Sequence, residues 1–146
     1  MKPKHIFVAV VIAVAIGDTL WRLHDPRWIV NITSGLRDWE QDAGGARFRW
    51  TSGHATFYVP SGAVEMTLPL RAVYPSADGR PVVASISVDD RLLTDVRLDD
   101  PQQWIESTVP LPRRSTGRSY RRVDVRVSRV VPEYNRGIQL GEIRTR

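Results

Sequence analysis

The sequence contains no cysteine, and its three histidines, His5, His24 and His54, are widely separated. Without cysteine the chain forms no disulfide, offers no thiolate to a metal ion and has no thiol nucleophile. No pair of histidines has the spacing of a zinc site. These absences predict a protein without a cofactor and without a zinc centre.

The signatures of hydrolytic enzymes are missing as well. Ser52 lacks the flanking glycine pattern of a nucleophile elbow, and the nearby His54 has no obvious acid to orient it. The carboxylates of Asp89–Asp90 and Asp99–Asp100 are adjacent in sequence, so the two members of each pair point apart instead of facing one glycosidic bond. Such pairs are typical of turns. The sequence therefore predicts a non-catalytic protein, with an enzyme of unrecognised site as a rival hypothesis.

Lysine is almost absent. Both lysines, Lys2 and Lys4, stand within the first four residues, and every later cationic residue is an arginine. The formal net charge is +5, and leaving out these two lysines leaves +3. A net positive charge this small is typical of an ordinary protein surface and not of a nucleic-acid binder.

At 146 residues the chain has room for one domain and an appendage.

The amino-terminal segment combines the two lysines with an apolar run from Ile6 to Ile16, which Gly17 and Asp18 end. This pattern is typical of a signal-anchor helix that crosses a membrane once. A cleaved signal peptide, with Ala15 and Gly17 as the small residues before the cut, is the second interpretation, and a buried helix of a soluble protein is the third. We adopt the first, which predicts a single-pass protein of the cell membrane whose carboxyl-terminal domain is extracytoplasmic.

This interpretation divides the chain into three parts. Residues 1–22 form the signal anchor or signal peptide, residues 23–46 a membrane-proximal linker, and residues 47–146 the folded domain. In the linker, apolar residues recur at mixed spacings around Pro26, which is typical of one or two short helical turns.

From residue 47 onward, apolar and polar residues alternate along short segments. This period of two is typical of strands that bury one face. The segments cover residues 48–59, 64–72, 82–88, 93–98, 104–111, 123–127 and 138–143. Asp89–Asp90 marks a hairpin turn, and Pro69 marks an edge or a bulge. The sequence therefore predicts an all-β fold, an antiparallel β-sandwich (jelly roll) of about eight strands preceded by one hydrophobic helix.

The stretch FRWTSGHATFYVP, residues 48 to 60, shows how one strand divides its side chains between two faces. Phe48, Trp50 and Phe57 hold inward positions and are predicted core residues, because burying such side chains contributes about 1.5 to 3 kcal/mol each. His54 and Tyr58 fall on the opposite, polar face. The polar face is therefore where we look for a ligand.

The later segments VVASISVDDRLL, WIESTVPLP and NRGIQLGEI make the chain similar to a known family. They resemble the galactose-binding-like (carbohydrate-binding-module-like) jelly rolls found extracytoplasmically beside bacterial membrane glycosyltransferases. The likeness covers roughly residues 47–146 and implies two stacked antiparallel sheets and a saccharide or glycolipid ligand. The positions that carry it are Ile86, Val88, Asp89, Asp90, Leu93, Trp104, Leu140 and Gly141.

The candidate ligand contacts are residues of the polar face or of loops, where side chains reach solvent. Trp104 is included although a core position is its other interpretation. By analogy with calcium-stapled jelly rolls, Asp42 and Glu142 with the carbonyls of Gly44 or Gly45 form the one candidate for a structural Ca²⁺, although no metal site is predicted. The full set of predicted ligand contacts is Arg49, His54, Tyr58, Trp104, Tyr134 and Arg136.

Arginines cluster between residues 113 and 129, opposed there by a single carboxylate, Asp124. Guanidinium groups bind oxyanions through paired hydrogen bonds. The cluster therefore predicts a site for phosphorylated glycans or lipid headgroups, with a solvated arginine-rich face as the alternative. Nucleic acid is not expected, since single-strand readers interleave aromatic residues with their cations. The predicted anion-binding residues are Arg113, Arg114, Arg118, Arg121 and Arg122.

These observations predict a non-catalytic, membrane-anchored β-sandwich protein that binds saccharide or glycolipid, or assists envelope glycan assembly. Its expected partners are the saccharide, the membrane through the amino-terminal helix, and a membrane glycosyltransferase. The alternative is a structural accessory subunit that docks on a multi-span membrane protein without binding glycan.

Overall fold

The computed structural model describes residues 3–23, 25–74, 79–113 and 117–146. In these ranges the chain forms an α-helix, α1 (Pro3–Leu23), a 3-10 helix, η1 (Arg27–Asn31), and nine strands. The strands are β1 (Ser34–Gln41), β2 (Arg47–Pro60), β3 (Glu65–Arg71), β4 (Val82–Val88), β5 (Arg91–Leu98), β6 (Ile105–Pro110), β7 (Tyr120–Val127), β8 (Gln139–Gly141) and β9 (Arg144–Thr145).

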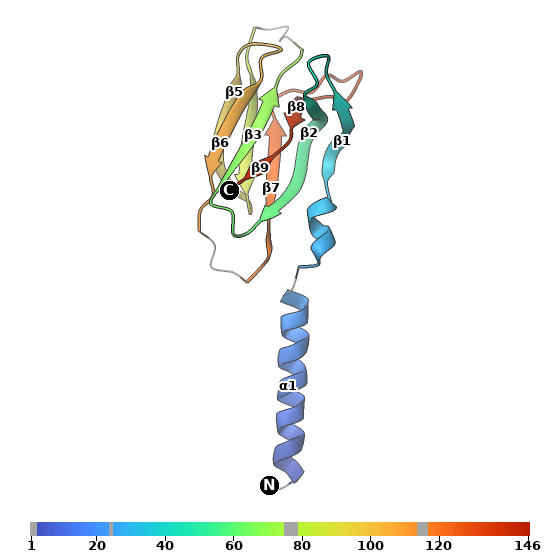
Figure 1. Ribbon diagram of the computed structural model, residues 1–146, viewed down its shortest axis with the longest axis vertical. Helices are drawn as coiled ribbons and strands as arrows, with labels where there is room; N and C mark the ends of the chain where they lie inside the picture. The colour runs from blue at the N-terminus through green and yellow to red at the C-terminus, as the bar shows by residue number, and fades with distance from the viewer. Residues whose placement is uncertain (1–2, 24, 75–78, 114–116) are drawn as a thin grey trace.

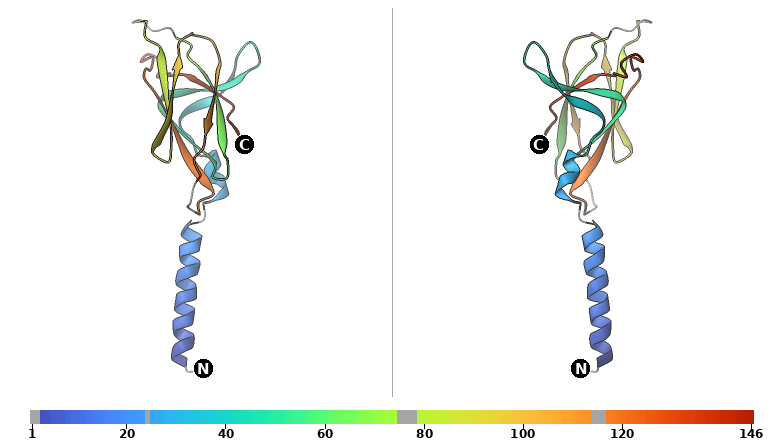
Figure 2. Two further views of the ribbon diagram at one scale, coloured as in Figure 1. Left: turned by 90° about the vertical axis from the view of Figure 1, so that its left-hand side faces the viewer. Right: turned by 90° about the vertical axis from the view of Figure 1, so that its right-hand side faces the viewer.

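The strands pair antiparallel in the order β5-β4-β7-β2-β8-β3-β6, with β1 beside β2 and β9 beside β3. The long strand β2 joins two layers, because residues 48–50 pair with β8 whereas residues 54–60 pair with β7. Figures 1 and 2 show the two layers facing each other. The antiparallel β-sandwich predicted from the sequence is confirmed.

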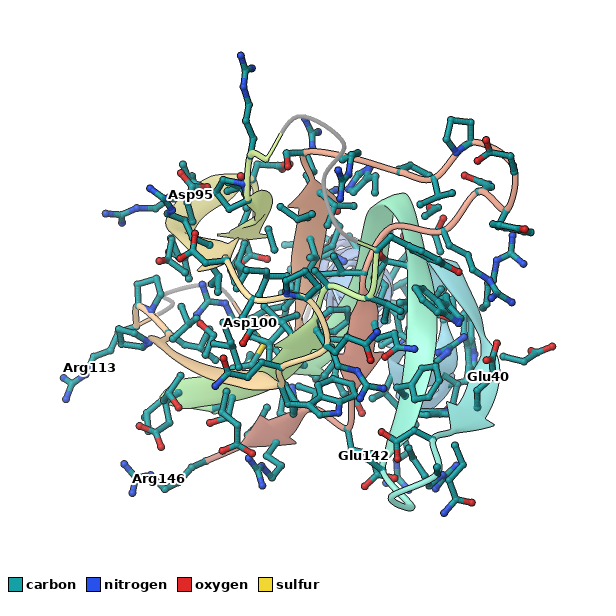
Figure 3. The ribbon with its side chains drawn as sticks, turned by 90° about the horizontal axis from the view of Figure 1, so that it is seen from above. Glu40, Asp95, Asp100, Arg113, Glu142 and Arg146 are labelled. Atoms are coloured by element: carbon teal, nitrogen blue, oxygen red, sulfur yellow. The ribbon has the colours of Figure 1, made fainter. Side chains whose placement is uncertain are left out.

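The core lies between the layers and follows the alternation of the strands. Met66, Leu68 and Leu70 on β3 are fully buried, as are the inward residues of β4 and β7. Phe48, Trp50 and Phe57 are 5%, 3% and 4% exposed, which confirms them as core residues. Among the described residues, Asp25, Arg121 and Asp124 are buried charged residues. Figure 3 shows the side chains of Arg113 and Arg146 extending away from the sandwich.

The turn between β4 and β5 is the hairpin that the sequence predicts. Asp89 and Asp90 both have positive φ, 50° and 67°, the backbone that a type I′ turn requires at its two central residues. The carboxylate of Asp89 accepts hydrogen bonds from Arg121 Nε (2.9 Å) and from the backbone N–H of Arg122 (3.2 Å). These bonds fasten the turn to β7, which compensates for the absence of glycine.

The segment expected to be a linker contains a strand. η1 supplies the expected helical turn, but β1 then runs antiparallel along β2, with a register shift around Gly35. The sequence of β1, SGLRDWEQ, lacks an apolar alternation because none of its side chains is fully buried. Pairing with the neighbouring backbone of β2, and not burial, makes this segment a strand.

The prediction of a membrane anchor is wrong. The amino-terminal segment is a helix, and Figures 1 and 2 show it standing apart from the sandwich. In the described part of the chain, however, no helix is both long enough and apolar enough to cross a membrane. The physical reason is the shortness of the apolar run from Ile6 to Ile16. At 1.5 Å per residue it covers about 16 Å, roughly half of a hydrocarbon core of about 30 Å.

Candidate functional site

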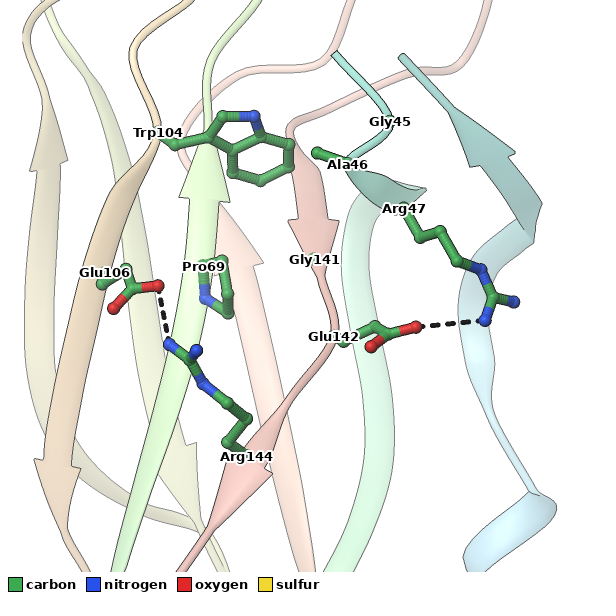
Figure 4. Close-up of a pocket in the computed structure, with 9 residues that line it drawn as sticks. All are labelled: Gly45, Ala46, Arg47, Pro69, Trp104, Glu106, Gly141, Glu142 and Arg144. Atoms are coloured by element: carbon green, nitrogen blue, oxygen red, sulfur yellow. Dashed lines mark hydrogen bonds and ion pairs between the residues drawn. The ribbon is translucent and has the colours of Figure 1, made fainter.

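The predicted ligand residue Trp104 lines a pocket of about 400 Å³ on the outer side of β3, β6 and β8. Figure 4 shows its parts: the Trp104 ring beside Ala46, a floor at Pro69 and Gly141, and charged side chains on either side. We call this site the Trp104 pocket. Its lining residues are Gly45, Ala46, Arg47, Pro69, Trp104, Glu106, Gly141, Glu142 and Arg144.

The floor of the Trp104 pocket is apolar because of a break between two short strands. On one side of β3, β8 pairs with Leu70 and Arg71, and β9 pairs with Met66 and Thr67. Pro69, predicted at an edge or a bulge, therefore lies in an interior strand, at a stretch where a missing N–H is tolerated on that side. A Cβ added to Gly141 would lie 2.9 Å from Pro69 Cβ. Glycine at this position therefore lets β8 pack closely against Pro69 and leaves no side chain on the floor of the pocket.

The Trp104 ring packs against the guanidinium group of Arg71. The Arg71 guanidinium carbon lies 4.4 Å from the centroid of the Trp104 ring and 5.8 Å from that of Phe48, within the range of cation–π attraction. Arg71 also donates from Nε to Gln139 Oε1 (2.6 Å) and forms an ion pair with Asp42 (3.1 Å). The arginine is thereby fixed on three sides, and it fixes the indole.

Asp42 organises the second wall of the Trp104 pocket. Its Oδ1 accepts the backbone N–H groups of Gly44 (3.0 Å) and Ala46 (2.9 Å). The pKa of Asp42 is lowered, first by the hydrogen bond from Ala46 and, against an opposing effect of burial, by the charge of Arg71. The indole N–H of Trp104 adds to this lowering, although it forms no hydrogen bond of normal geometry with any described residue.

The contacts of Asp42 also bear on the calcium candidate. One oxygen of Asp42 faces backbone N–H groups and the other faces Arg71, while Glu142 pairs with Arg47. Across the described ranges, no three acidic or histidine side chains are grouped as metal ligands. The arrangement is that of a turn stabilised by an arginine.

Two ion pairs flank the floor of the Trp104 pocket. Arg144 donates to Glu106 at 2.6 Å, and Arg47 donates to Glu142 at 3.1 Å. All four side chains are more than half exposed, so these pairs contribute little to stability. They do place two carboxylates and two guanidinium groups next to an aromatic wall (Figure 4). Their formal charges cancel.

The predicted residues His54 and Tyr58 line a different pocket, of about 330 Å³, on the polar face of β2 and β7. We call it the Asp124 pocket, after the carboxylate at its base. Asp124 accepts hydrogen bonds from Thr56 Oγ1 (2.7 Å) and Arg122 Nε (2.9 Å), and its Oδ1 lies 2.9 Å from His54 Nε2. The full lining is Ile32, Ser34, His54, Thr56, Tyr58, Asp90, Arg122, Asp124 and Arg126.

The electrostatics of the Asp124 pocket are those of an ionised carboxylate. Burial alone would raise the pKa of Asp124, but the hydrogen bonds from Thr56, His54 and Arg122 and the charge of Arg122 together lower it. The hydrogen bond to Asp124 and the charge of that carboxylate raise the pKa of Arg122, with a further contribution from Asp90. The carboxylate and guanidinium therefore form a fixed pair at the base of the pocket.

The remaining predicted contacts lie elsewhere. Arg49 is half-buried under β1, where its NH2 donates to Thr33 Oγ1 and to the carbonyl of Leu36 (both 3.3 Å), and burial lowers its pKa. Tyr134 is 57% exposed in the loop after β7. The guanidinium of Arg136 lies 4.9 Å from the ring centroid of Trp50. The structure brings Arg49 and Tyr58 to one further pocket and places Arg136 6.0 Å from the Tyr134 ring, but the six predicted contacts do not form a single site.

The predicted anion-binding arginines are mostly paired with carboxylates. Arg121 is 4% exposed and bound to Asp89, which leaves it no surface for an external ligand. Arg118 pairs with the buried Asp25 (2.9 Å), and Arg122 pairs with Asp124. Arg113 is exposed and extends outward (Figure 3), and Arg114 lies outside the described residues. Anion binding by this arginine cluster stays a prediction.

Sequence reasoning missed the residues that complete the two pockets. Arg71 and Asp124 appeared as ordinary polar positions of alternating strands, and the partners of each ion pair around Trp104 are far apart in the chain. Glu106 and Arg144 are 38 residues apart, and Arg47 and Glu142 are 95 residues apart. Only the register of the sheet brings them together, so no local signal could have found them.

Comparison with known proteins gives matches among solved structures only. No family model matches the sequence, and no curated protein matches it significantly. The chain is similar to the C-terminal domain of EclA, described as a sugar-binding protein, with a TM-score of 0.45 and 11% identity over 79% of this chain and 65% of that one. The chain thus spans less than two thirds of that protein.

Two further solved structures are carbohydrate-binding modules. The likeness to a family 6 module has a TM-score of 0.47 and 12% identity, covering 80% of this chain and 86% of that one. The likeness to a family 35 module from Clostridium thermocellum has a TM-score of 0.47 and 11% identity, and it covers 77% of this chain and 88% of that one. The likeness to solved structures is therefore to carbohydrate-binding modules, the class of jelly rolls that the sequence resembles. At these identities it says nothing about the ligand.

Proposed function

We propose that this protein is a non-catalytic saccharide-binding domain that holds a neutral sugar in the Trp104 pocket. The observation that carries the proposal is the combination in one concave site of an aromatic wall, an apolar floor and two flanking carboxylate–guanidinium pairs. Ligand pockets are mostly apolar surfaces with a few convergent polar groups that fix the orientation of the ligand.

Saccharides match this combination because their rings have apolar C–H faces and hydroxyl groups around the edge. Trp104 and Pro69 offer surfaces to the ring, while Glu106 and Glu142 accept hydrogen bonds and Arg47 and Arg144 donate them. Hydrogen bonds to charged groups are stronger than those between neutral groups. The four side chains need no large movement to reach a sugar, because they already flank the floor (Figure 4).

The charge of the Trp104 pocket favours a neutral sugar over an anionic one. Each arginine of the pocket is matched by a glutamate at 2.6 Å or 3.1 Å. An anion would gain from the arginines about what it loses to the carboxylates, whereas neutral hydroxyl groups use both kinds of partner. The source of the sugar, an envelope glycan or glycolipid handled together with a membrane glycosyltransferase, remains part of the proposal.

The experiment is a titration of the full chain with a panel of neutral mono- and disaccharides, measured by isothermal titration calorimetry. We expect Trp104→Ala to weaken the binding of the responding sugar at least tenfold, about 1.4 kcal/mol. Trp28→Ala is the matched control, because Trp28 is 60% exposed on η1 and lines none of the Trp104 pocket.

Two results would contradict the proposal. One is the absence of binding across the panel, which would favour the accessory subunit without a glycan ligand. The other is an equal loss of affinity in both tryptophan variants. Because Trp104 also contacts Arg71, a folded-state check by thermal unfolding accompanies each variant, and Glu106→Gln serves as a second, milder test of the same pocket.

A further inference from the structure

The Asp124 pocket contains an arginine that forms no ion pair with a carboxylate of the described residues. Arg126 is exposed on β7 and lines the pocket. It takes part in no ion pair or hydrogen bond with any residue in the described part of the chain, in contrast to Arg118, Arg121 and Arg122. A free guanidinium inside a concave site is a ready partner for an oxyanion.

The sheet places Arg126 among groups that can assist it. His54 is its direct neighbour on β2, and Tyr58 is opposite Arg122. Such opposed residues share one face of an antiparallel pair, with Cβ atoms roughly 5 Å apart. Tyr58 and His54 line the same pocket as the free guanidinium, and His54 is the one directly beside it.

The two carboxylates of the Asp124 pocket are less repulsive than their number suggests. The side chain of Asp124 is 10% exposed and lies under Thr56, His54 and Arg122, which occupy its oxygens. Asp90 is bound by the other end of Arg122. Arg122 thus binds both carboxylates, which leaves Arg126 as the arginine of this pocket that is bound to neither of them.

We propose that the Asp124 pocket is a second ligand site, which binds an oxyanion through a paired hydrogen bond from Arg126. The ligand is a small molecule bearing a carboxylate or a phosphate, since both match the geometry of a guanidinium. This site shares no lining residue with the Trp104 pocket. Oxyanion binding at Arg126 is therefore independent of sugar binding in the Trp104 pocket.

The experiment is an NMR titration of the full chain with acetate, inorganic phosphate, glucuronate, glucose 6-phosphate and glucose at low ionic strength. We expect at least one class of oxyanion to bind, with an affinity that falls as salt is added. We expect Arg126→Gln to weaken oxyanion binding at least tenfold. Arg126→Lys weakens it less, because lysine keeps the charge but lacks the paired N–H donors of a guanidinium. Arg97→Gln is the matched control, since Arg97 is an exposed arginine on β5 outside the pocket.

The set of ligands distinguishes a phosphate from a carboxylate ligand, and the variants distinguish oxyanion binding from neutral-sugar binding. Binding of the phosphates alone identifies a phosphate ligand, and binding of acetate and glucuronate alone identifies a carboxylate ligand. The proposal is overturned if no oxyanion binds, if glucose binds at this pocket as well as the anions do, or if Arg97→Gln and Arg126→Gln lose affinity equally. Trp104→Ala leaves oxyanion binding unchanged, so failure of the neutral-sugar proposal is seen separately.

Discussion

At the scale of single residues, Arg71 connects the interior of the sandwich to its proposed ligand. It lies 15% exposed between Trp104, Phe48, Gln139 and Asp42. Removing one partner of a buried ion pair is costly, whereas replacing buried charged groups by apolar side chains of similar size often changes stability little. We therefore assign it a positioning role: it orients the indole and, through Asp42, the loop that forms the opposite wall.

This role gives the first prediction. Arg71→Met keeps an extended side chain but removes the cation–π contact, the hydrogen bond to Gln139 and the ion pair with Asp42. We expect the affinity for the sugar bound in the Trp104 pocket to fall about tenfold, or 1.4 kcal/mol, while the protein stays folded. Arg71→Lys restores part of the affinity, because lysine keeps the charge beside Trp104 and Asp42. If both variants bind as the parent does, Arg71 does not position the site.

A second prediction concerns the dependence of stability on pH. The pKa values of Asp42 and Asp124 are lowered in the folded protein, whereas in the unfolded chain an aspartate titrates near about 3.9. The unfolded state therefore binds more protons in this range, and stability rises with pH there. The contribution is fully present above about pH 4 to 5 and is lost as the pH falls through the lowered pKa values.

Asp124→Asn tests this account at one residue. The amide cannot replace the charge that accepts from Thr56 and Arg122, so we expect a loss of about 1.5 to 3 kcal/mol at neutral pH and a shallower fall of stability below about pH 4. Urea unfolding followed at several pH values measures both. Asp99→Asn is the control, because Asp99 is an exposed partner in a surface pair. An unchanged slope in Asp124→Asn would contradict the assignment.

At the scale of elements, burial decided which strands the sequence could reveal. β3, β4 and β7 alternate because one face of each lies in the core, and their positions were predictable from period two alone. The hairpin at Asp89–Asp90 was predictable from its turn residues, although its positive φ values needed the structure. β1 was missed, since an exposed edge strand has no apolar rhythm. For Pro69 the sequence predicted an edge or a bulge; the structure instead places it beside the break between β8 and β9, which depends on tertiary pairing.

Gly35 gives the third prediction, because it lets β1 lie against β2. Its φ is +65°, and a Cβ there would lie 1.9 Å from the carbonyl oxygen of His54. We expect Gly35→Ala to displace β1 and to lower the free energy of unfolding by about 1 to 3 kcal/mol, measured by urea unfolding. Gly62→Ala is the matched control, since no atom lies within 4 Å of its added methyl group. Equal stability of the two variants would show that β1 contributes nothing.

At the scale of the whole molecule, the fold could be predicted but the site could not. Alternation along the chain specifies a sandwich, and the resemblance to jelly rolls pointed to the same architecture. The Trp104 pocket is made by β3, β6, β8 and the loop after β1, and its charge pairs depend on which strands become neighbours. Trp104 was the one residue of that pocket predicted as a ligand contact, on the ground that residues of the polar face or of loops reach solvent.

The measurement that tests the central claim most directly is a ¹H–¹⁵N NMR titration of the full chain with the neutral sugar of highest affinity. The account predicts that the indole N–H of Trp104 and the amides of Gly45, Ala46 and Gly141 shift and saturate with one dissociation constant, while the amides around Asp124 stay in place. Shifts that leave the Trp104 indole unmoved, or that gather around Asp124, would contradict the claim that the Trp104 pocket holds the sugar.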